Sequence, residues 1–304
     1  MHNANKLKIG LFGSNCSSGR AVTMVPERYV ASEESALVHY LNGGPAVPLL
    51  TPPRPFERGV RGRPTLVSNV ETLANVALIS RYGADWFRSL GASSAPGSAL
   101  VTITGAVRRP GVYEIALGTP LRDVLALAGG TDAALQAVLA GGYFGSWLPA
   151  SVALNAAASA PGLRAAGASL GAGVLLVLPA GGCGLAETAR VVRYLAGQSA
   201  GQCGPCLNGL PEIAATMEQA ASGAATGLVL RTLHNLYGLV EGRGACHLPD
   251  GVARLVASAL RVFADDVRRH QRGPCPGARG RPVFAVPSGA DAPPAGSGFA
   301  AYRR

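Results

Sequence analysis

Two cysteines separated by two residues, Cys203 and Cys206, enclose the dipeptide Gly204-Pro205. This turn sequence lets the backbone curl, so that both sulfur atoms can face one metal centre. A third cysteine, Cys246, follows far along the chain. A cubane iron–sulfur cluster requires four thiolates, and Ala200 stands three residues before Cys203, where a fourth cysteine would fall. The pattern is typical of a metal centre, and it leaves the fourth ligand open.

Three interpretations of these cysteines stay open on the residues alone. The first is an iron–sulfur cluster, complete or incomplete, held by Cys203, Cys206 and Cys246. The second is a zinc site in which His247 supplies the fourth ligand, although adjacent residues rarely bind the same ion. The third is a set of buried, inert thiols beside a helical core.

The fourth ligand of such a centre has few sources in the chain. Cys183 precedes an expected helix over residues 185–199, which separates it from Cys203 by roughly 20 Å at about 1.5 Å per residue. We therefore do not expect it to join the centre. Cys275 lies beyond the last expected helix and would have to fold back. Ser199, solvent or an external thiol are the remaining donors.

Composition limits the class of protein. The 304 residues are enough for two or three domains, and no apolar run reaches the length of a membrane-spanning helix. The net charge is +10, but no basic run with interleaved aromatic residues suggests nucleic-acid binding. We expect no nucleic-acid partner and no membrane insertion. The clustering of cysteines favours metal chemistry in a reducing, cytoplasmic compartment.

Changes in composition and periodicity divide the chain into five segments. Residues 1–24 differ from the rest and are interpreted as a divergent leader. Residues 25–95 carry helical periods, residues 96–180 begin with strands, and residues 183–272 are helical. Residues 273–304 are rich in Pro, Gly and Ala, so we expect a disordered tail. The chain is therefore predicted to be an α+β multidomain protein.

The strand-rich segment has the element order of a β-grasp domain. Strands expected at 99–105 and 112–115 form a hairpin around a Pro-Gly turn, a compact helix follows over 119–130, and the strand 174–178 closes the sheet. The helical segment is predicted to form a small four-helix bundle. Its helices are expected near 185–199, 209–222, 227–240 and 250–270.

Polar residues at two expected helix starts are candidates for cofactor binding. Glu33 and Glu34 begin the helix that runs to about residue 42, and Asn69 and Thr72 begin the one that runs to about Tyr82. Free N–H groups at a helix start attract phosphate, and acidic groups there can order a flavin or a nicotinamide. Plain helix capping explains the same residues. Sequence alone favours capping for the two glutamates.

Four blocks, in order, resemble the NADH-binding flavoprotein subunit of respiratory complex I and of related formate- or hydrogen-linked dehydrogenases. Residues 29–37 (YVASEESAL) resemble the family's block beside the flavin, and residues 62–73 (GRPTLVSNVETL) resemble the block that holds FMN phosphate. Residues 105–130 are similar to its soluble-ligand-binding β-grasp domain. The fourth block comprises residues 201–206 and Cys246 and resembles its cluster domain.

The resemblance implies cofactors, partners and site residues. It implies an iron–sulfur cluster on Cys203, Cys206 and Cys246, together with FMN and NADH near Glu33, Glu34, Asn69 and Thr72. It also implies a partial FMN-binding α/β segment over 25–95 and an electron relay from reduced flavin or NADH to a redox protein, either ferredoxin-like or another dehydrogenase subunit. The alternative is a non-catalytic interaction module with a vestigial cluster or a zinc site.

The departures from the family all touch cofactors. Ser32 replaces a Gly beside the flavin, Ser68 replaces the first Asn of a pair, and Ala200 replaces the first cluster cysteine. The family's Gly-rich flavin and NADH loop should precede residue 28 by a long stretch, and residues 1–24 do not resemble it. We therefore expect an N-terminally truncated, divergent relative whose NADH oxidation depends on a loop from elsewhere.

Overall fold

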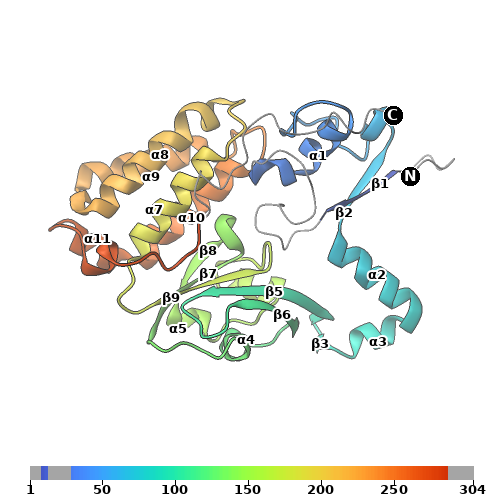
Figure 1. Cartoon of the computed structure of the whole chain (residues 1–304), viewed down its shortest axis with the longest axis horizontal. Coiled ribbons are helices and arrows are strands. Elements are labelled where there is room, and N and C mark those ends of the chain that lie inside the picture. Colours follow the sequence, from blue (N-terminus) through green and yellow to red (C-terminus); the bar gives the residue numbers. More distant parts are fainter. Residues whose placement is uncertain (1–7, 13–28, 287–304) are drawn as a thin grey trace.

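The centre of the molecule is a five-stranded mixed sheet with helices on both faces (Figure 1). The computed structural model describes residues 8–12 and 29–286. The strands lie side by side in the order β6-β5-β9-β7-β8. Their bounds are Ser98–Gly105 (β5), Gly111–Ala116 (β6), Leu135–Ala140 (β7), Ser146–Pro149 (β8) and Val174–Pro179 (β9).

The central strand β9 explains why the sheet is buried on both sides. It pairs in parallel with β5 and antiparallel with β7. Because side chains alternate along a strand, Leu176 and Leu178 enter one core while Leu175 and Val177 enter the other. Its almost continuous apolar sequence is typical of a strand covered on both faces. The predicted hairpin and closing strand are present, with the closing strand in the middle of the sheet.

Helices from the C-terminal half cover one face of the sheet, and three shorter helices cover the other. The first group comprises α7 (Gly184–Gly197), α8 (Leu210–Gln219), α9 (Gly227–Val240), α10 (Leu248–Val262) and α11 (Ala264–His270). The second comprises α4 (Leu121–Leu127), α5 (Ala150–Ala153) and α6 (Ala160–Ala165). Helix α7 packs on α8 and α10, and α10 also contacts α9 and β8.

The predicted last helix is broken in two at Phe263. This residue has a non-helical backbone (φ −102°, ψ 34°) and separates α10 from α11. Its buried ring packs edge-on against Trp147, with centroids 4.9 Å apart, and a Cβ placed on Gly184 would come within 2.3 Å of the ring. The break therefore lets one aromatic ring enter the joint between β8 and the start of α7. Two π-helical turns, η5 (Pro205–Gly209) and η6 (Ala220–Ala224), flank α8.

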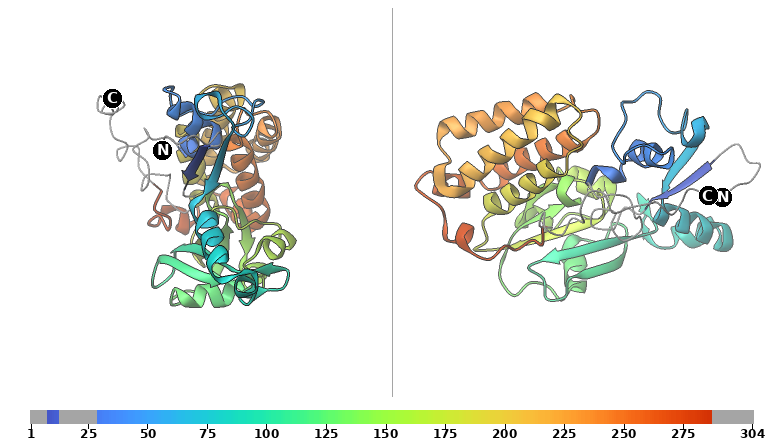
Figure 2. Two further views of the ribbon diagram at one scale, coloured as in Figure 1. Left: turned by 90° about the vertical axis from the view of Figure 1, so that its right-hand side faces the viewer. Right: turned by 45° about the horizontal axis from the view of Figure 1, so that its top comes forward.

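The N-terminal part forms a separate arm beside the helices (Figure 2). Strand β1 (Lys8–Phe12) pairs in parallel with β2 (Thr65–Asn69), so part of the expected leader pairs with the segment that follows it. The expected helices are α1 (Glu34–Leu41), preceded by a 3₁₀ turn (Tyr29–Ser32), and α2 (Val70–Tyr82). The arm ends in α3 (Ala84–Arg88) and the short strands β3 (Gly91–Ala92) and β4 (Ala95–Pro96). Helix α2 has no buried side chain.

The first part of the expected disordered tail packs on the helical group. Residues 273–286 include the buried side chains of Cys275 and Phe284. Val283 and Phe284 donate backbone hydrogen bonds to the Glu187 carboxylate, at 2.8 and 3.3 Å. The rest of the predicted tail, and most of the predicted leader, lie outside the described residues. Within 8–12 and 29–286, no helix combines the length and apolar character needed to cross a bilayer.

Trp147 joins the sheet to the helices, and its truncation tests this joint. Its ring is 1% exposed, stacks on Phe284, and donates a 3.0 Å hydrogen bond from Nε1 to Thr188 on α7. We expect Trp147→Ala to lower the free energy of unfolding by about 3–5 kcal/mol, because it opens a cavity and removes the hydrogen bond. Urea unfolding measures this loss. The other tryptophan, Trp86, is 43% exposed, and Trp86→Ala should cost far less; equal losses would contradict the assigned role.

Candidate metal centre

The loop after α7 holds the first two predicted cysteines. Helix α7 ends at Gly197, and the chain turns through Gly201 (φ +65°), a left-handed conformation that favours glycine, before entering η5. Cys206 is buried and Cys203 is half-buried. The N–H of Gly201 donates to the Cys206 sulfur. The turn therefore brings a backbone donor onto the thiol that will carry charge when it binds a metal.

The third cysteine enters from the loop between α9 and α10. Cys246 is half-buried, and its sulfur accepts a hydrogen bond from the N–H of Leu248. Asp250 secures this loop, since its carboxylate accepts from Gly242 N at 2.7 Å and lies 3.0 Å from His247 Nδ1. The His247 side chain is 93% exposed. The imidazole that the zinc interpretation required is thus turned to solvent and paired with Asp250.

The three thiols face one another closely enough to interact. Burial raises the pKa of Cys206 to about 12, and the adjacent Cys203 and Cys246 add to this effect. Burial is also the main reason why the pKa of Cys246 is raised, followed by the negative charge of Glu33 and by Cys203. The metal-free site therefore keeps its protons, and a metal has to displace them as it binds. The sequence prediction that Cys206 and Cys246 meet across the chain agrees with this geometry.

The position of the absent fourth cysteine lies against the protein core. Ala200 is half-buried and packs on the apolar cluster beneath the helices, and Ser199 next to it is buried. A methyl group offers no donor atom. The donor set at this loop is therefore three thiols, which fits a cluster whose fourth ligand is not a cysteine of this loop.

One of the predicted flavin residues borders the cysteine site. Glu33 caps α1 by accepting hydrogen bonds from Ser35 N and Ala36 N, at 2.9 and 3.1 Å, and its charge acts on Cys246. The backbone N–H of Tyr29 donates to the Gln198 side chain at 2.9 Å. The segment before α1 therefore lies against the loop that holds the cysteines. Glu34 follows in the first turn of α1 and is half-buried.

The other two predicted flavin residues lie at the start of α2. Asn69 caps this helix, with its side-chain oxygen accepting from Glu71 N at 2.8 Å, and Thr72 is exposed. Glu71 in turn accepts from Leu100 N at 2.7 Å, which ties the helix start to β5. The capping role expected for Asn69 is thus observed. These contacts leave a ligand role for Asn69 and Thr72 as a prediction.

The structure also assembles a group that the sequence reasoning missed. Cys275 does fold back, but to the opposite end of α7, where it meets Cys183 and His270. Burial raises the pKa of Cys183 to about 12, against a hydrogen bond from Ala186 N that lowers it. The available signal was the His270-x4-Cys275 spacing after the last helix, which places two ligand types close together in the chain.

Comparison with known proteins supports an iron–sulfur identity for the helical region. Residues 186–270 match the NADH-ubiquinone oxidoreductase-F iron-sulfur binding region, and residues 100–142 match the SLBB domain. The first match contains Cys203, Cys206 and Cys246, and the second begins in β5 and covers the hairpin and α4. These matches define the class of protein: an SLBB domain joined to an iron–sulfur binding region.

Relatives extend the similarity to most of the chain. It is 34% identical over 257 residues to the F subunit of the NADH-quinone oxidoreductase of Mycobacterium tuberculosis, covering 82% of this chain and 56% of the relative. For the second such subunit of Rhizobium meliloti the identity is 32% over 279 residues, or 90% and 66%. A crystal structure of an NAD⁺-reducing [NiFe]-hydrogenase aligns with a TM-score of 0.74 at 32% identity, covering 80% of this chain and 42% of that one.

The chain belongs with the F subunits of NADH-quinone oxidoreductases, which confirms the resemblance identified from its sequence. Its expected cofactor, an iron–sulfur cluster, is confirmed at the level of this family. The chain spans between about half and two-thirds of the length of these curated relatives.

Alkylation of the metal-free protein tests the environment of the thiols. With a pKa of about 12, the Cys206 thiol is ionised in only about one molecule in ten thousand at pH 8, and the thiolate is the reactive form. We expect iodoacetamide to label Cys203 well before Cys206, and the difference to shrink as the pH approaches 12. Peptide mass spectrometry after timed quenching measures both sites. Equal rates in the folded chain, matching those in urea, would contradict the burial of Cys206.

Proposed function

We propose that the chain holds an iron–sulfur cluster through Cys203, Cys206 and Cys246 and relays electrons between a flavin and a redox partner protein. The observation that carries this proposal is the meeting of three thiols from two distant loops within a region whose family binds iron–sulfur clusters. When bound, the cluster would supply one-electron transfer, while the chain would supply ligation, burial and hydrogen bonds that set the potential.

The residues around the thiols suit a centre that gains and loses charge. The N–H groups of Gly201 and Leu248 donate to the sulfurs of Cys206 and Cys246, and such donors stabilise added negative charge on the cluster. Cys206 is buried, which excludes water from one side. Cys203 and Cys246 are half-buried, so the other side stays open to an external ligand or to a partner protein.

The wider architecture follows from the same proposal. We assign residues 25–95 to a partial flavin-binding segment, 96–180 to a β-grasp ligand-binding domain and 183–272 to a four-helix iron–sulfur bundle. Glu33, Glu34, Asn69 and Thr72 are proposed to face FMN or NADH held with the help of another Gly-rich segment. The contact between Tyr29 and Gln198 supports a short path from such a flavin to the cysteine loop. The partner is proposed to be ferredoxin-like or another dehydrogenase subunit.

Anaerobic reconstitution with iron and sulfide tests the cluster. We expect the wild-type chain to bind iron and sulfide with a paramagnetic signal on reduction, and Cys206→Ser to lose both, because a buried thiolate ligand is removed. Cys275→Ser is the matched control, since this buried thiol lies at the other end of α7. Zinc in place of iron, or iron binding unchanged by Cys206→Ser, would refute the proposal.

Restoring the family's cysteine sharpens the same test. Ala200→Cys adds a thiol where the fourth ligand belongs, so we expect the iron content to approach four per chain and the cluster to resist a chelator for longer. Ala196→Cys, one helical turn earlier on α7, adds an equivalent thiol away from the loop. Equal retention of iron by both variants would show that position 200 does not face the cluster.

The charge of Glu33 next to Cys246 predicts an effect on the reduction potential. Removing a nearby negative charge favours the reduced cluster, so Glu33→Gln should raise the midpoint by tens of millivolts, given about 2.3 kcal/mol per charge for 100 mV. Glutamine keeps an oxygen for the helix cap. Glu34→Gln makes the same change of charge in the next residue, and a redox titration compares the two. A larger shift in Glu34→Gln would contradict the assignment.

A further inference from the structure

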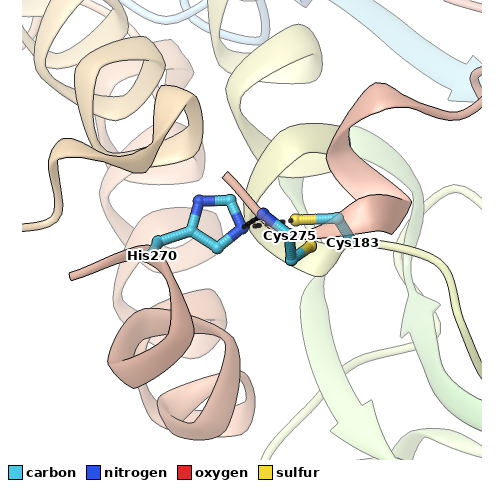
Figure 3. A group of neighbouring side chains, drawn as sticks. All are labelled: Cys183, His270 and Cys275. Atoms are coloured by element: carbon cyan, nitrogen blue, oxygen red, sulfur yellow. Dashed lines mark hydrogen bonds between the residues drawn. The ribbon is translucent and has the colours of Figure 1, made fainter. Parts of the chain in front are cut away.

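Three buried metal-ligating side chains converge at the start of α7. The Cys183 sulfur, the Cys275 sulfur and a ring nitrogen of His270 all lie within 4.8 Å of one another (Figure 3). The Cys183 sulfur is 3.4 Å from His270 Nε2. Ligand atoms around a tetrahedral zinc ion stand about 3.6–3.8 Å apart, given Zn–S near 2.3 Å and Zn–N near 2.0–2.1 Å. The three atoms are therefore spaced for a single ion.

The imidazole is held in the tautomer that a metal requires. His270 Nδ1 lies 3.1 Å from the carbonyl oxygen of Ala220, which can only accept a hydrogen bond, so Nδ1 carries the proton. The lone pair of Nε2 then faces Cys183 and the backbone N–H of Cys275, which is 3.4 Å away (Figure 3). A carbonyl that orients the far nitrogen is the usual second partner of a metal-bound histidine.

We propose that Cys183, His270 and Cys275 form a mononuclear metal site for zinc, separate from the cluster centre. The three side chains are at most 7% exposed. Two thiolates and one neutral imidazole select soft or borderline ions, and zinc suits a tetrahedral site of this composition. Three protein ligands leave the fourth position to a solvent molecule.

The surroundings favour a positive ion over two free thiols. Cys183 caps α7, and its sulfur accepts from Ala186 N at 3.4 Å, so the helix start stabilises a thiolate there. Asp266 is 1% exposed, accepts from Gly184 N at 3.3 Å and pairs with Arg269. With Arg269 offsetting Asp266, a dication would balance the two thiolates.

The site would fasten the C-terminal segment to the rest of the chain. Its ligands come from the loop before α7, the end of α11 and the segment beyond it. A Cβ added to Gly277 would come within 2.3 Å of the Gly181 carbonyl, so the segment passes tightly over the Cys183 loop. Arg190 extends the attachment by donating to the Phe284 carbonyl at 2.9 Å.

Cobalt titration of the full chain tests the site in isolation from the cluster. The background is the Cys203→Ser/Cys206→Ser/Cys246→Ser variant, with folding checked by circular dichroism. We expect one Co²⁺ per chain with a thiolate-to-cobalt charge-transfer band, displaced by zinc. Adding Cys275→Ser or His270→Gln should weaken cobalt binding more than about a hundredfold. His234→Gln removes an exposed imidazole and should leave binding unchanged.

A second measurement keeps the test valid if the multiple variant does not fold. In the otherwise wild-type chain, zinc should raise the melting midpoint, and Cys275→Ser should abolish that rise while Cys16→Ser keeps it. Failure of cobalt to bind, binding without a thiolate band, or binding unaffected by Cys275→Ser would overturn the proposal. A Cys183–Cys275 disulfide that persists in thiol reductant would overturn it as well. None of these outcomes bears on iron and sulfide binding at Cys206.

Discussion

The packing of α7 is the constraint on which both cysteine groups depend. This helix buries Leu185, Val192 and Leu195 on the face that it turns toward α8 and α10. Its fourteen residues separate Cys183 at one end from the Cys203 loop at the other, a span of about 21 Å at 1.5 Å per residue. Because a packed helix cannot shorten, the two thiol groups cannot merge into one centre.

Burial gives the two groups different chemistry from similar residues. At the 203–246 end, loops supply the thiols, one side is half-buried, and backbone N–H groups point at sulfur. At the 183–275 end, the ligands are enclosed by two helix termini and a covering segment, and an imidazole is included. The first arrangement suits a redox centre near a partner surface, and the second suits a structural ion shielded from solvent.

The sequence predicted local elements well and long-range returns of the chain less well. Periodicity located the hairpin, α2, α7 and α9, because each has a pattern that shows directly in its own residues. The break at Phe263 was missed because the apolar period continues through it. The break depends on Trp147 and Gly184, which meet Phe263 only in the folded chain.

The candidate site divides in the same way. The meeting of Cys206 and Cys246 followed from the family's motif, whereas the partner of Cys275 did not. A Pro- and Gly-rich composition suggested disorder for residues after 272, but Cys275 and Phe284 are buried. Composition reports average solvation and says nothing of two specific anchors. Glu33 combines a predictable helix-cap role with an unpredictable neighbour, Cys246, from the far half of the chain.

The place of β9 in the sheet has a consequence for synthesis on the ribosome. The strand lies between β5 and β7 although it is the last of the five along the chain. Until residue 179 has emerged, β5 and β7 each present an open edge toward the gap, and the two hairpins have no shared core. Open edges of this kind invite pairing with other chains. Helix α7 follows β9 after four residues, so the sheet closes just as the helix that fixes both thiol groups becomes available.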